Sequence, residues 1–296
     1  MIRSLHHSDF PLELLLERKR EPVTVVLPAR EVADTIGPIV ESLQTLGDLI
    51  DQILVVDAAS ADGSAEIAAR LGAEVRQESE LLPEFGPVLG KGDAMWRSLA
   101  AARGDLIAYL DSDTREFAAH FATGLLGALI CNGELDFAKA TYRRPFTTPE
   151  GVELPSGGGR VSELTARPLL SAFYPELAAF AQPLAGEVAA RRELLERVPY
   201  ATGYAVETAM LLNVREALGG VEGMAQVDLG VRLNQHQPLD RLGPMAYAVI
   251  GAIRDRLRRE GRLTDGALPP FRTAVGELVD VDLTERPPFS TVGARA

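Results

Sequence analysis

The sequence predicts an α/β protein with a mostly parallel central sheet and helices on both faces. Short apolar, β-branched runs recur along the chain and alternate with segments whose apolar residues fall at helical spacing. Glycine, proline or carboxylate residues follow these runs, as is typical of strands that end at the edge of a sheet. Strands that alternate with helices form right-handed βαβ units, so neighbouring strands are expected to run parallel.

Composition limits the possible ligands and locations. The chain has 296 residues, 46% of them hydrophobic, which is enough for one large or two ordinary domains. A net charge of -12 disfavours nucleic-acid binding, and no apolar run is long enough for membrane insertion. The single cysteine, Cys131, lies in an apolar helical segment and is interpreted as a core residue. With no secretory signal at the start, a cytoplasmic protein is expected.

The alternation of predicted strands and helices is clearest in the first half of the chain. The first predicted strand covers 23–27 and ends at Pro28, because proline cannot donate to a ladder. The alternation then continues with a helix over 34–46, a strand over 53–56, a helix over 65–71, a strand over 72–75 and a helix over 94–103, which Lys91, Gly92 and Asp93 precede.

Two carboxylates follow the next strand. The run over 106–110 is typical of a strand buried on both faces of a sheet, and Asp111 and Asp113 come directly after it. Open α/β sheets bind ligands where their strands end, and carboxylates are hard oxygen ligands for a divalent ion. The pair therefore predicts a metal ion that carries a diphosphate. A plain polar turn is the alternative when these residues are considered alone.

The second half adds a predicted anion site. The segment over 156–163 runs from successive glycines into a helix that begins near Arg160. Backbone N–H groups of such a turn converge on an anion, and the planar guanidinium of Arg160 can hold a phosphate or carboxylate. A flexible linker is the alternative for the glycines, but Arg160 and Ser162 at the helix start favour the anion site.

The remaining predicted elements carry few residues with an expected chemical role. Glu207 lies in the first turn of a helix over 203–213, where the helix dipole alone can explain a carboxylate. A strand over 226–232 leads into a polar loop that contains His236. Two further helices are predicted over 189–197 and 245–259, and an irregular tail follows the second of them.

The order of motifs resembles a known class of enzymes. Pro28-Ala-Arg-Glu31 follows the first strand in place of Gly-x-Gly-x-x-Gly, and the sequence has no P-loop motif. Asp57 after the second strand, then Gly90-Lys-Gly, then Asp111-Ser-Asp resembles the nucleotide-sugar-dependent glycosyltransferases of the GT-A fold. In that fold, the first carboxylate recognises the nucleotide and the Asp-x-Asp motif holds the metal.

A larger set of motifs resembles the glucosyl- and mannosyl-3-phosphoglycerate synthases, a retaining GT-A family. The resemblance covers residues 23 to about 242 and implies hexose transfer from a nucleotide sugar to the 2-hydroxyl of 3-phosphoglycerate for compatible-solute synthesis. The motifs are Leu27-Pro-Ala, Gly90-Lys-Gly, Trp96-Arg-Ser-Leu-Ala, Asp111-Ser-Asp, Tyr142-Arg-Arg-Pro, Gly157-Gly-Gly-Arg-Val-Ser-Glu, Ala166-Arg-Pro-Leu-Leu, Gln182-Pro-Leu-Ala-Gly-Glu, Gly203-Tyr-Ala-Val-Glu and Leu229-Gly-Val-Arg.

The resemblance implies three sets of site residues and a divalent cofactor, Mg²⁺ or Mn²⁺. The donor would be bound by Leu27, Ala29, Arg30, Glu31, Asp57, Ser60, Lys91, Asp111 and Ser112. The acceptor would be bound by Gly158, Gly159, Arg160 and Ser162. The metal would be held by Asp113, Asp111 and His236, and the residues closest to the chemistry would be Asp113, Glu207 and Lys91.

Two departures from the family pattern affect these expectations. Val32-Ala33 stand where the family carries acidic residues, and Glu31 precedes them. Asn234 stands where the family has its metal-binding histidine. His236 would lie on the same side of an extended segment as Asn234 and is expected to be the third metal ligand, with Asn234 as the alternative. The departures favour a mannosyl enzyme that uses GDP-mannose over a glucosyl enzyme that uses UDP- or GDP-glucose.

The expected mechanism is electrostatic stabilisation of the leaving diphosphate by the metal and Lys91. Glu207 is the only candidate nucleophile for a double-displacement route, whereas attack on the leaving-group face needs no protein nucleophile. Two other classes stay open, a sugar-nucleotide nucleotidyltransferase and a non-catalytic sugar-nucleotide-binding protein. The first normally has a glycine-rich loop after its first strand, which this chain lacks.

Four segments are expected along the chain. They are an N-terminal arm over 1–21, a nucleotide-sugar-binding subdomain over 22–135, an acceptor-binding subdomain over 136–242, and a C-terminal helix with an irregular tail over 243–296. The resemblance also implies a homodimer.

Overall fold

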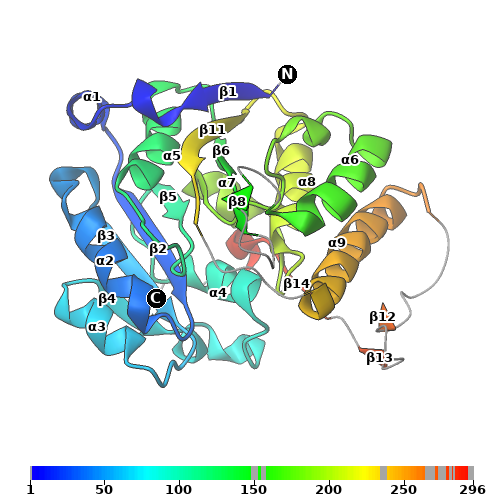
Figure 1. Ribbon diagram of the computed structural model, residues 1–296, viewed down its shortest axis with the longest axis horizontal. Helices are drawn as coiled ribbons and strands as arrows, with labels where there is room; N and C mark the ends of the chain where they lie inside the picture. Colours follow the sequence, from blue (N-terminus) through cyan, green and yellow to red (C-terminus); the bar gives the residue numbers. More distant parts are fainter. Residues whose placement is uncertain are drawn as a thin grey trace.

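An eight-stranded sheet runs through the molecule and has helices on both faces (Figure 1). The computed structural model describes residues 2–147, 153–154, 158–233, 239–263, 271–272, 278–279, 282 and 284–292. The strands of the sheet are β1 (Arg3–His6), β2 (Val23–Ala29), β3 (Gln52–Asp57), β4 (Glu74–Gln77), β5 (Leu106–Tyr109), β6 (Phe137–Arg143), β9 (Val188–Arg191) and β11 (Met224–Val231). Their order is β1-β11-β6-β9-β5-β2-β3-β4.

The helices divide into two layers. Those described are α1 (Leu12–Arg18), α2 (Ala33–Gln44), α3 (Ser64–Arg70), α4 (Lys91–Ser98), α5 (His120–Cys131), α6 (Arg167–Phe173), α7 (Arg192–Arg197), α8 (Val206–Leu218) and α9 (Leu239–Arg259). Residues of α1, α2, α3 and α5 share one hydrophobic cluster, and residues of α4, α6, α7, α8 and α9 share another. The sheet lies between the two clusters.

Alternation along the strands assigns each side chain to a layer. On β2, Val25 and Leu27 belong to the cluster with α2, whereas Val26 belongs to the cluster with α4. On β5, Ala108 and Tyr109 divide in the same way. Because every second residue points to the opposite face, an apolar run is buried on both sides. The predicted α/β fold with a mostly parallel sheet is confirmed.

One strand runs against the others. β9 is antiparallel to both of its neighbours, β5 and β6, while the pairs β1–β11, β11–β6, β5–β2, β2–β3 and β3–β4 are parallel. Tyr109 at the end of β5 and Lys139 on β6 both pair with Val188, the first residue of β9. The beginning of β9 therefore lies beside the ends of the parallel strands.

The expected end of the first strand at Pro28 was wrong. β2 continues to Ala29, and Pro28 pairs with Val56 of β3. The Pro28 carbonyl accepts a hydrogen bond from Ser112, on the side of β5, and β5 pairs with β2 only up to Val26. β5 no longer pairs with β2 at the level of Pro28, so the missing N–H of this proline removes no hydrogen bond from the sheet.

Two helix boundaries also differ from the sequence prediction. α4 begins at Lys91 and ends at Ser98, so Lys91-Gly92-Asp93 form its first turn and do not precede it. The predicted helix over 189–197 combines two elements, the second half of β9 and α7. Alanine and arginine favour helices in isolation, but Ala189 and Ala190 lie between β5 and β6, where pairing on both sides outweighs that preference.

The N-terminal residues were predicted as an arm, but they add an edge strand to the sheet. β1 pairs in parallel with β11, and α1 packs against α5. Leu15 of α1 is fully buried. The high exposure of β1 is typical of an edge strand, which the sequence alone presents as a polar stretch.

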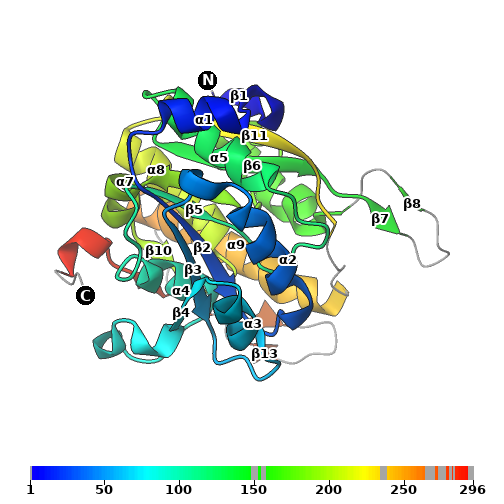
Figure 2. The same cartoon turned by 90° about the vertical axis from the view of Figure 1, so that its left-hand side faces the viewer.

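The C-terminal tail was predicted as irregular, but its described part packs on the core. Strand β14 (Glu285–Arg286) pairs with β10 (Tyr200–Ala201), and the 3-10 turn η7 (Phe289–Thr291) lies beside α7 (Figure 2). The indole N–H of Trp96 on α4 donates to the Pro287 carbonyl at 2.8 Å, and Phe289 meets the same ring edge-on. The tail therefore covers α4.

A buried ion pair fastens the tail to the first turn of α4. Arg286 donates through Nε and Nη2 to the two carboxylate oxygens of Asp93, each at 2.8 Å. Asp93 is fully buried, and although burial opposes its charge, Arg286 holds the pKa of this carboxyl below its usual value. The same turn is held by the Thr202 carbonyl, which accepts from the Gly92 N–H at 2.8 Å.

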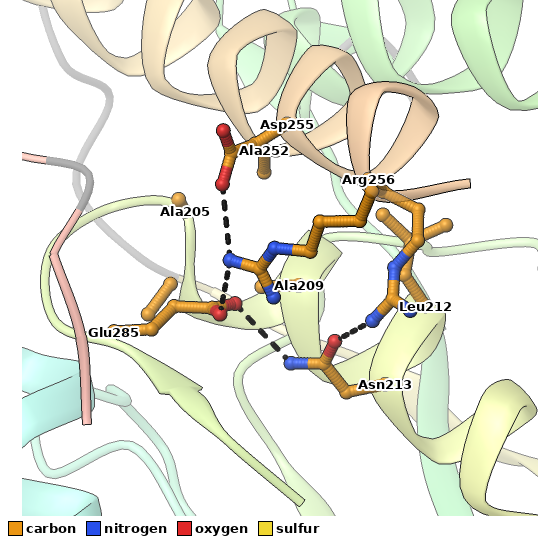
Figure 3. Close-up of a pocket in the computed structure, with 10 residues that line it drawn as sticks. Ala205, Ala209, Leu212, Asn213, Ala252, Asp255, Arg256 and Glu285 are labelled. Atoms are coloured by element: carbon orange, nitrogen blue, oxygen red, sulfur yellow. Dashed lines mark hydrogen bonds and ion pairs between the residues drawn. The ribbon is translucent and has the colours of Figure 1, made fainter. Parts of the chain in front are cut away.

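The tail also joins α8 and α9 around a shallow pocket. Figure 3 shows Asn213 of α8 between Glu285 of the tail and Arg256 of α9. Asn213 donates to Glu285 at 3.4 Å and accepts from Arg256, and Arg259 pairs with Glu285 at 2.6 Å. Alanines supply most of the apolar lining. Arg259 pairs with Asp255 and Glu285 at its rim, and Arg256 pairs with Glu216 of α8, so this pocket serves to attach α9 and the tail.

None of the helices in the described part of the chain is long and apolar enough to cross a membrane. Two short hairpins complete the described structure, β7 (Phe146–Thr147) with β8 (Glu153–Leu154) and β12 (Phe271–Arg272) with β13 (Leu278–Val279). The expected segment boundaries at residues 21, 135 and 242 stay a prediction.

Replacing Arg286 by methionine should lower the free energy of unfolding by about 3 kcal/mol, because it leaves the buried carboxylate of Asp93 without its principal partner. Urea denaturation measures the change. The control is Arg258→Met, which removes a half-exposed arginine that pairs with Asp255 on α9 and should cost less than about 1 kcal/mol. Equal losses in the two variants would contradict a special role for the Arg286–Asp93 pair.

Candidate active site

The charged residues of the candidate site gather where the parallel strands end. Asp57 ends β3, Asp111 follows β5, and Arg232 follows β11. Glu187 immediately precedes the antiparallel β9, and its carbonyl accepts from the Ala140 N–H of β6 at 3.0 Å. We call this side of the sheet the carboxyl edge. The topology thus brings together side chains from distant parts of the chain.

Three residues predicted for the site contact one another at the carboxyl edge. Lys91 Nζ lies 2.6 Å from Asp111 Oδ1 and 3.0 Å from Glu207 Oε1. Burial opposes the charge on Lys91, but the two carboxylates outweigh it and raise its pKa well above the usual value. Burial likewise opposes ionisation of Asp111, yet Lys91 and Arg232 hold its pKa well below the usual range. Lys91 and Asp111 are therefore both charged at neutral pH.

Arg232 connects the two aspartates of the Asp-x-Asp motif. Its Nη2 lies 2.8 Å from Asp111 Oδ2 and 3.1 Å from Asp113 Oδ1. The Arg232 side chain is only 4% exposed, whereas that of Asp113 is 64% exposed. The motif therefore has one inner carboxylate, held by two cations, and one outer carboxylate that faces solvent.

A buried acid holds the other side of Arg232. Nη1 lies 2.9 Å from Glu187 Oε1 and donates to the Tyr142 hydroxyl at 2.8 Å, while Tyr142 donates to Glu187 Oε2 at 2.9 Å. Burial raises the pKa of Glu187, although Arg232 opposes the shift. Sequence reasoning missed Glu187, Tyr142 and Arg232 as site residues. The available signal was a charged or hydroxyl group at the end of an otherwise apolar strand.

A third buried cation lies behind these residues. Lys139 on β6 is 1% exposed and donates to the Ala185 carbonyl at 2.5 Å. It lines a small cavity together with Met95, Gly186 and Glu207. Burial lowers the pKa of Lys139 to about 8, although the nearby Glu207 carboxylate opposes the shift. Lys139 is thus a second ammonium group on the inner side of Glu207.

Gly186 is required by the close approach of the backbone to the Lys91–Asp111 pair. A Cβ at this position would lie 2.4 Å from Asp111 Oδ1 and 2.5 Å from Lys91 Nζ. Those distances are shorter than any non-bonded contact of a real side chain allows. The chain before β9 therefore forms the wall against which the ion pair is positioned.

Residues predicted for donor binding form a hydrogen-bonded loop pair. The Glu31 N–H donates to Ser60 Oγ at 2.9 Å, and the Ser60 N–H donates to Asp57 Oδ2 at 3.0 Å. Asp57 Oδ2 also accepts from Gln77 at 3.0 Å, but the buried Asp57 Oδ1 has no hydrogen-bond partner among the described residues. A buried acceptor without a partner is costly, so this oxygen fits a ligand N–H or O–H.

The other predicted donor residues lie in or next to β2 and the Asp-x-Asp turn. Ala29 closes β2, and Arg30 after it is exposed. The Leu27 side chain lies in the hydrophobic core, which leaves only its backbone for a donor contact. Ser112 is buried and donates to the Pro28 carbonyl, while its own carbonyl accepts from Thr35 at 2.6 Å. The turn is therefore fixed to both β2 and α2.

The predicted acceptor residues lie near the end of β6. The Gly158 N–H donates to the Arg144 carbonyl at 3.2 Å, and Gly159 has a left-handed φ of 76°. Arg160 is half-buried, and Ser162 begins a π-helical turn, η5 (Ser162–Ala166). The glycine turn therefore exists where the anion site was predicted, and a helix begins at Arg160 as expected, but it passes through the π-helical turn η5 before it continues as α6.

The residues predicted as metal ligands are only partly within the described part of the chain. The carboxylates of Asp111 and Asp113 both contact the same guanidinium nitrogen of Arg232. Their hard oxygens, which already face a cation here, are the type of ligand that a divalent ion prefers. In the part of the chain that the structure describes, no group of three His, Cys, Asp or Glu side chains is arranged to hold a metal ion. His236 and Asn234 lie outside the described residues.

Comparison with known proteins agrees with this geometry. The family model described as glycosyl transferase family 2 matches residues 24–129, which contain the predicted donor loops and the Asp-x-Asp motif. The glucosyl-3-phosphoglycerate synthase of Petrotoga mobilis is 41% identical over 88% of this chain and 82% of its own length. That of Mycolicibacterium smegmatis is 42% identical over 92% of this chain and 90% of its own length.

Two solved structures share the whole fold. Mannosyl-3-phosphoglycerate synthase from Rubrobacter xylanophilus is 48% identical, with a TM-score of 0.88 over 98% of this chain and 97% of its own. Glucosyl-3-phosphoglycerate synthase from Mycobacterium tuberculosis, in complex with Mn²⁺, UDP-glucose and phosphoglyceric acid, is 37% identical, with a TM-score of 0.86 over 98% and 99%.

These identities extend over nearly the full chain, and they confirm the GT-A fold that the motif order predicted. They also confirm a glycosyltransferase, so the nucleotidyltransferase and binding-protein alternatives are set aside. The chain belongs to the glucosyl/mannosyl-3-phosphoglycerate synthase family.

Proposed function

We propose that this hexosyl-3-phosphoglycerate synthase uses GDP-mannose and glycosylates the 2-hydroxyl of 3-phosphoglycerate, and that the product serves as a precursor of the compatible solute mannosylglycerate. The observation that carries the transfer chemistry is the Lys91–Asp111–Glu207 contact at the carboxyl edge, beside the Asp-x-Asp carboxylates. Mannose as the sugar is supported by the 48% identity to the Rubrobacter mannosyl enzyme and by the two departures from the glucosyl pattern.

Glucose is the alternative sugar, with UDP- or GDP-glucose as the donor. The curated relatives that match at 41–42% identity are glucosyl-3-phosphoglycerate synthases, and the Mycobacterium tuberculosis structure was solved with UDP-glucose. With either donor, the nucleotide is proposed to lie at Asp57 and Ser60. The buried Asp57 Oδ1 would then accept a hydrogen bond from an N–H group of the base. The two proposals differ only in which base and which C2 epimer the site prefers.

Asp111 and Asp113 are the residues that would hold the divalent ion, Mg²⁺ or Mn²⁺, with His236 as the proposed third ligand. The bound ion supplies Lewis-acid stabilisation to a diphosphate. Lys91 adds a positive charge that does not depend on pH in the neutral range, because its two carboxylate partners keep it protonated. The rigid first turn of α4 positions Lys91, so its charge needs no reorganisation as the leaving group forms.

Glu207 is proposed to position Lys91 and the acceptor without forming a covalent intermediate. Its Oε1 is engaged by Lys91 at 3.0 Å, and the second ammonium group of Lys139 lies behind it. A carboxylate compensated by two cations is a weak nucleophile, whereas it is well suited to orient hydroxyl groups. Attack on the face of the leaving group, with a diphosphate oxygen accepting the proton, retains the configuration and needs no protein nucleophile.

The acceptor phosphate is proposed to lie at the glycine turn. Gly158 packs closely on Arg144, Gly159 adopts a left-handed φ, and Arg160 and Ser162 follow them at the start of the helix. This turn packs against Arg144 at the end of β6, on the same edge of the sheet as Glu207. The arrangement holds the acceptor carboxylate or phosphate away from the donor diphosphate and directs its 2-hydroxyl toward the sugar.

A cytoplasmic location and a homodimer complete the proposal. The location is supported by the single cysteine, Cys131, which is free and partly buried on α5. Burial raises the pKa of its thiol, so the group is a poor nucleophile and suits a structural role. The dimer is carried over from the family resemblance.

A donor panel tests the proposed reaction. With 3-phosphoglycerate and Mg²⁺ or Mn²⁺, we expect release of GDP from GDP-mannose at a higher rate than release from UDP-glucose or GDP-glucose, and we expect EDTA to abolish it. Omission of the acceptor is the control. Faster turnover of a glucose donor would identify the glucosyl enzyme, and no acceptor-dependent release from any donor would contradict the synthase proposal.

The Glu207→Gln variant tests the role of that carboxylate. We expect kcat to fall by about 10²-fold, because one preorganised charge is lost, and the product to keep its anomeric configuration. Glu216→Gln removes an exposed carboxylate from the same helix and should leave kcat unchanged. Unchanged turnover in Glu207→Gln would exclude any positioning role, while a trapped glycosyl-enzyme would establish a covalent route.

The Gly186→Ala variant tests whether the Lys91–Asp111 geometry controls the rate. The added methyl group cannot fit beside the ion pair, so we expect it to displace Lys91 and to lower kcat by about 10²-fold. Gly133→Ala is the matched control, because a Cβ there meets nothing within 4 Å. Near-UV circular dichroism checks that both variants fold. A folded Gly186→Ala enzyme with normal kcat would refute the role given to this contact.

A further inference from the structure

Arg232 engages the same carboxylates that are proposed to bind the metal ion. Its Nη2 contacts both Asp111 Oδ2 and Asp113 Oδ1, at 2.8 and 3.1 Å. The remaining oxygen of Asp111 is engaged by Lys91. A divalent ion that binds between the two aspartates must therefore replace at least one existing cation contact of the inner carboxylate.

Physical chemistry explains why a cation is already present there. Two ionised carboxylates separated by a single residue repel each other, and the repulsion is strong where the inner one is removed from water. The guanidinium compensates it, and its planar fork reaches the aspartates and Glu187 at the same time. The outer carboxylate is 64% exposed, so an incoming ion can approach from the side of Asp113.

The other side of Arg232 does not move as easily. Glu187 is fully buried, and Tyr142 donates to it and accepts from Arg232. Separating Arg232 from Glu187 would leave a buried charge without its partner, which is strongly unfavourable. Nη1 is therefore anchored, while Nη2 can exchange its acceptors.

We propose that Arg232 is a positioning residue that keeps the metal-binding carboxylates together in the free enzyme and transfers Nη2 to the diphosphate of the donor when the ion enters. The proposal rests on the metal site assigned above. Once an ion takes the oxygens of Asp111 and Asp113, Nη2 loses both acceptors within a buried environment. A diphosphate oxygen restores an acceptor, so the nucleotide lowers the cost of binding the ion.

Two consequences follow for binding. The ion should bind weakly to the free enzyme, because it competes with Arg232, and the nucleoside diphosphate should strengthen its binding. By linkage, the ion strengthens nucleotide binding by the same factor. Removing the Glu187 charge should change the affinity for the ion in the opposite direction to removing the Arg232 charge. Without the Glu187 carboxylate, Arg232 keeps the two aspartates as its carboxylate partners among the described residues and should compete more strongly with the ion.

Mn²⁺ binding, measured by electron paramagnetic resonance of the free ion, tests the proposal without an activity assay. In the wild-type chain we expect GDP to raise Mn²⁺ affinity by about tenfold, after correction for the Mn²⁺–GDP complex formed in protein-free solution. In Arg232→Gln, Mn²⁺ alone should bind about tenfold more tightly, and the additional effect of GDP should be lost. UDP replaces GDP in a parallel series, in case the donor carries uracil.

Two further variants separate competition from a general charge effect. Arg143→Gln removes a positive charge from the exposed end of the neighbouring strand β6 and should change Mn²⁺ affinity by less than about twofold. Glu187→Gln should weaken Mn²⁺ binding. If Arg232→Gln fails to fold because Glu187 is left unpaired, the double variant Arg232→Gln/Glu187→Gln removes both charges and should still bind Mn²⁺ more tightly than the wild type.

The outcomes discriminate clearly. Mn²⁺ affinity that is unchanged or weaker in Arg232→Gln and in the double variant would overturn the role of Arg232 and leave the metal site intact. An equal gain in Arg143→Gln would reduce the effect to general electrostatics and also overturn it. A wild-type chain that binds Mn²⁺ neither alone nor with a nucleoside diphosphate would overturn both this inference and the metal assignment beneath it.

Discussion

The antiparallel strand β9 is the constraint on which the rest of the site depends. It lies between β5 and β6 in a sheet whose other described pairs are parallel, so its first residues meet the ends of its neighbours. Gly186 and Glu187 thereby reach the edge where Asp111 and Arg232 emerge from β5 and β11. A purely parallel sheet would deliver only strand ends to this edge. The antiparallel strand β9 adds the backbone at Gly186 and the buried carboxylate of Glu187 to this edge.

The charges at this edge form a network whose three central groups, Asp111, Lys91 and Arg232, each have at least two ionic partners. Asp111 is shared by Lys91 and Arg232, Lys91 by Asp111 and Glu207, and Arg232 by two aspartates and Glu187. Removal of these groups from water is costly, and mutual pairing compensates the cost. A network of this kind holds its members in one geometry, which is the property that preorganised electrostatic catalysis requires. Its stability and its chemistry therefore depend on the same contacts.

The sequence predicted those parts of the structure that depend on local pattern. The strands β2, β3 and β5 and the position of Asp111 and Asp113 follow from apolar runs and from the polar residues after them. β9 was mistaken for a helix, because its alanines lack β propensity and only its neighbours make it a strand. The partnership of Arg232 with Asp111 joins residues 121 positions apart, and no local pattern encodes it. The predicted ends of β2 and α4 were wrong for a similar reason. β5 pairs with β2 only up to Val26, so Pro28 can stay in the strand, and the distant Thr202 carbonyl holds the first turn of α4.

The Arg286–Asp93 contact also has a consequence for the order in which the protein matures. It joins residues 193 positions apart, and it closes over the helix turn that carries Lys91. During synthesis, Asp93 leaves the ribosome long before Arg286, and in the interval its carboxylate and the Trp96 ring have no tail to cover them. Contacts of such high sequence separation form late and slow the completion of folding. The turn that carries Lys91 therefore reaches its final surroundings only after Arg286 has been translated.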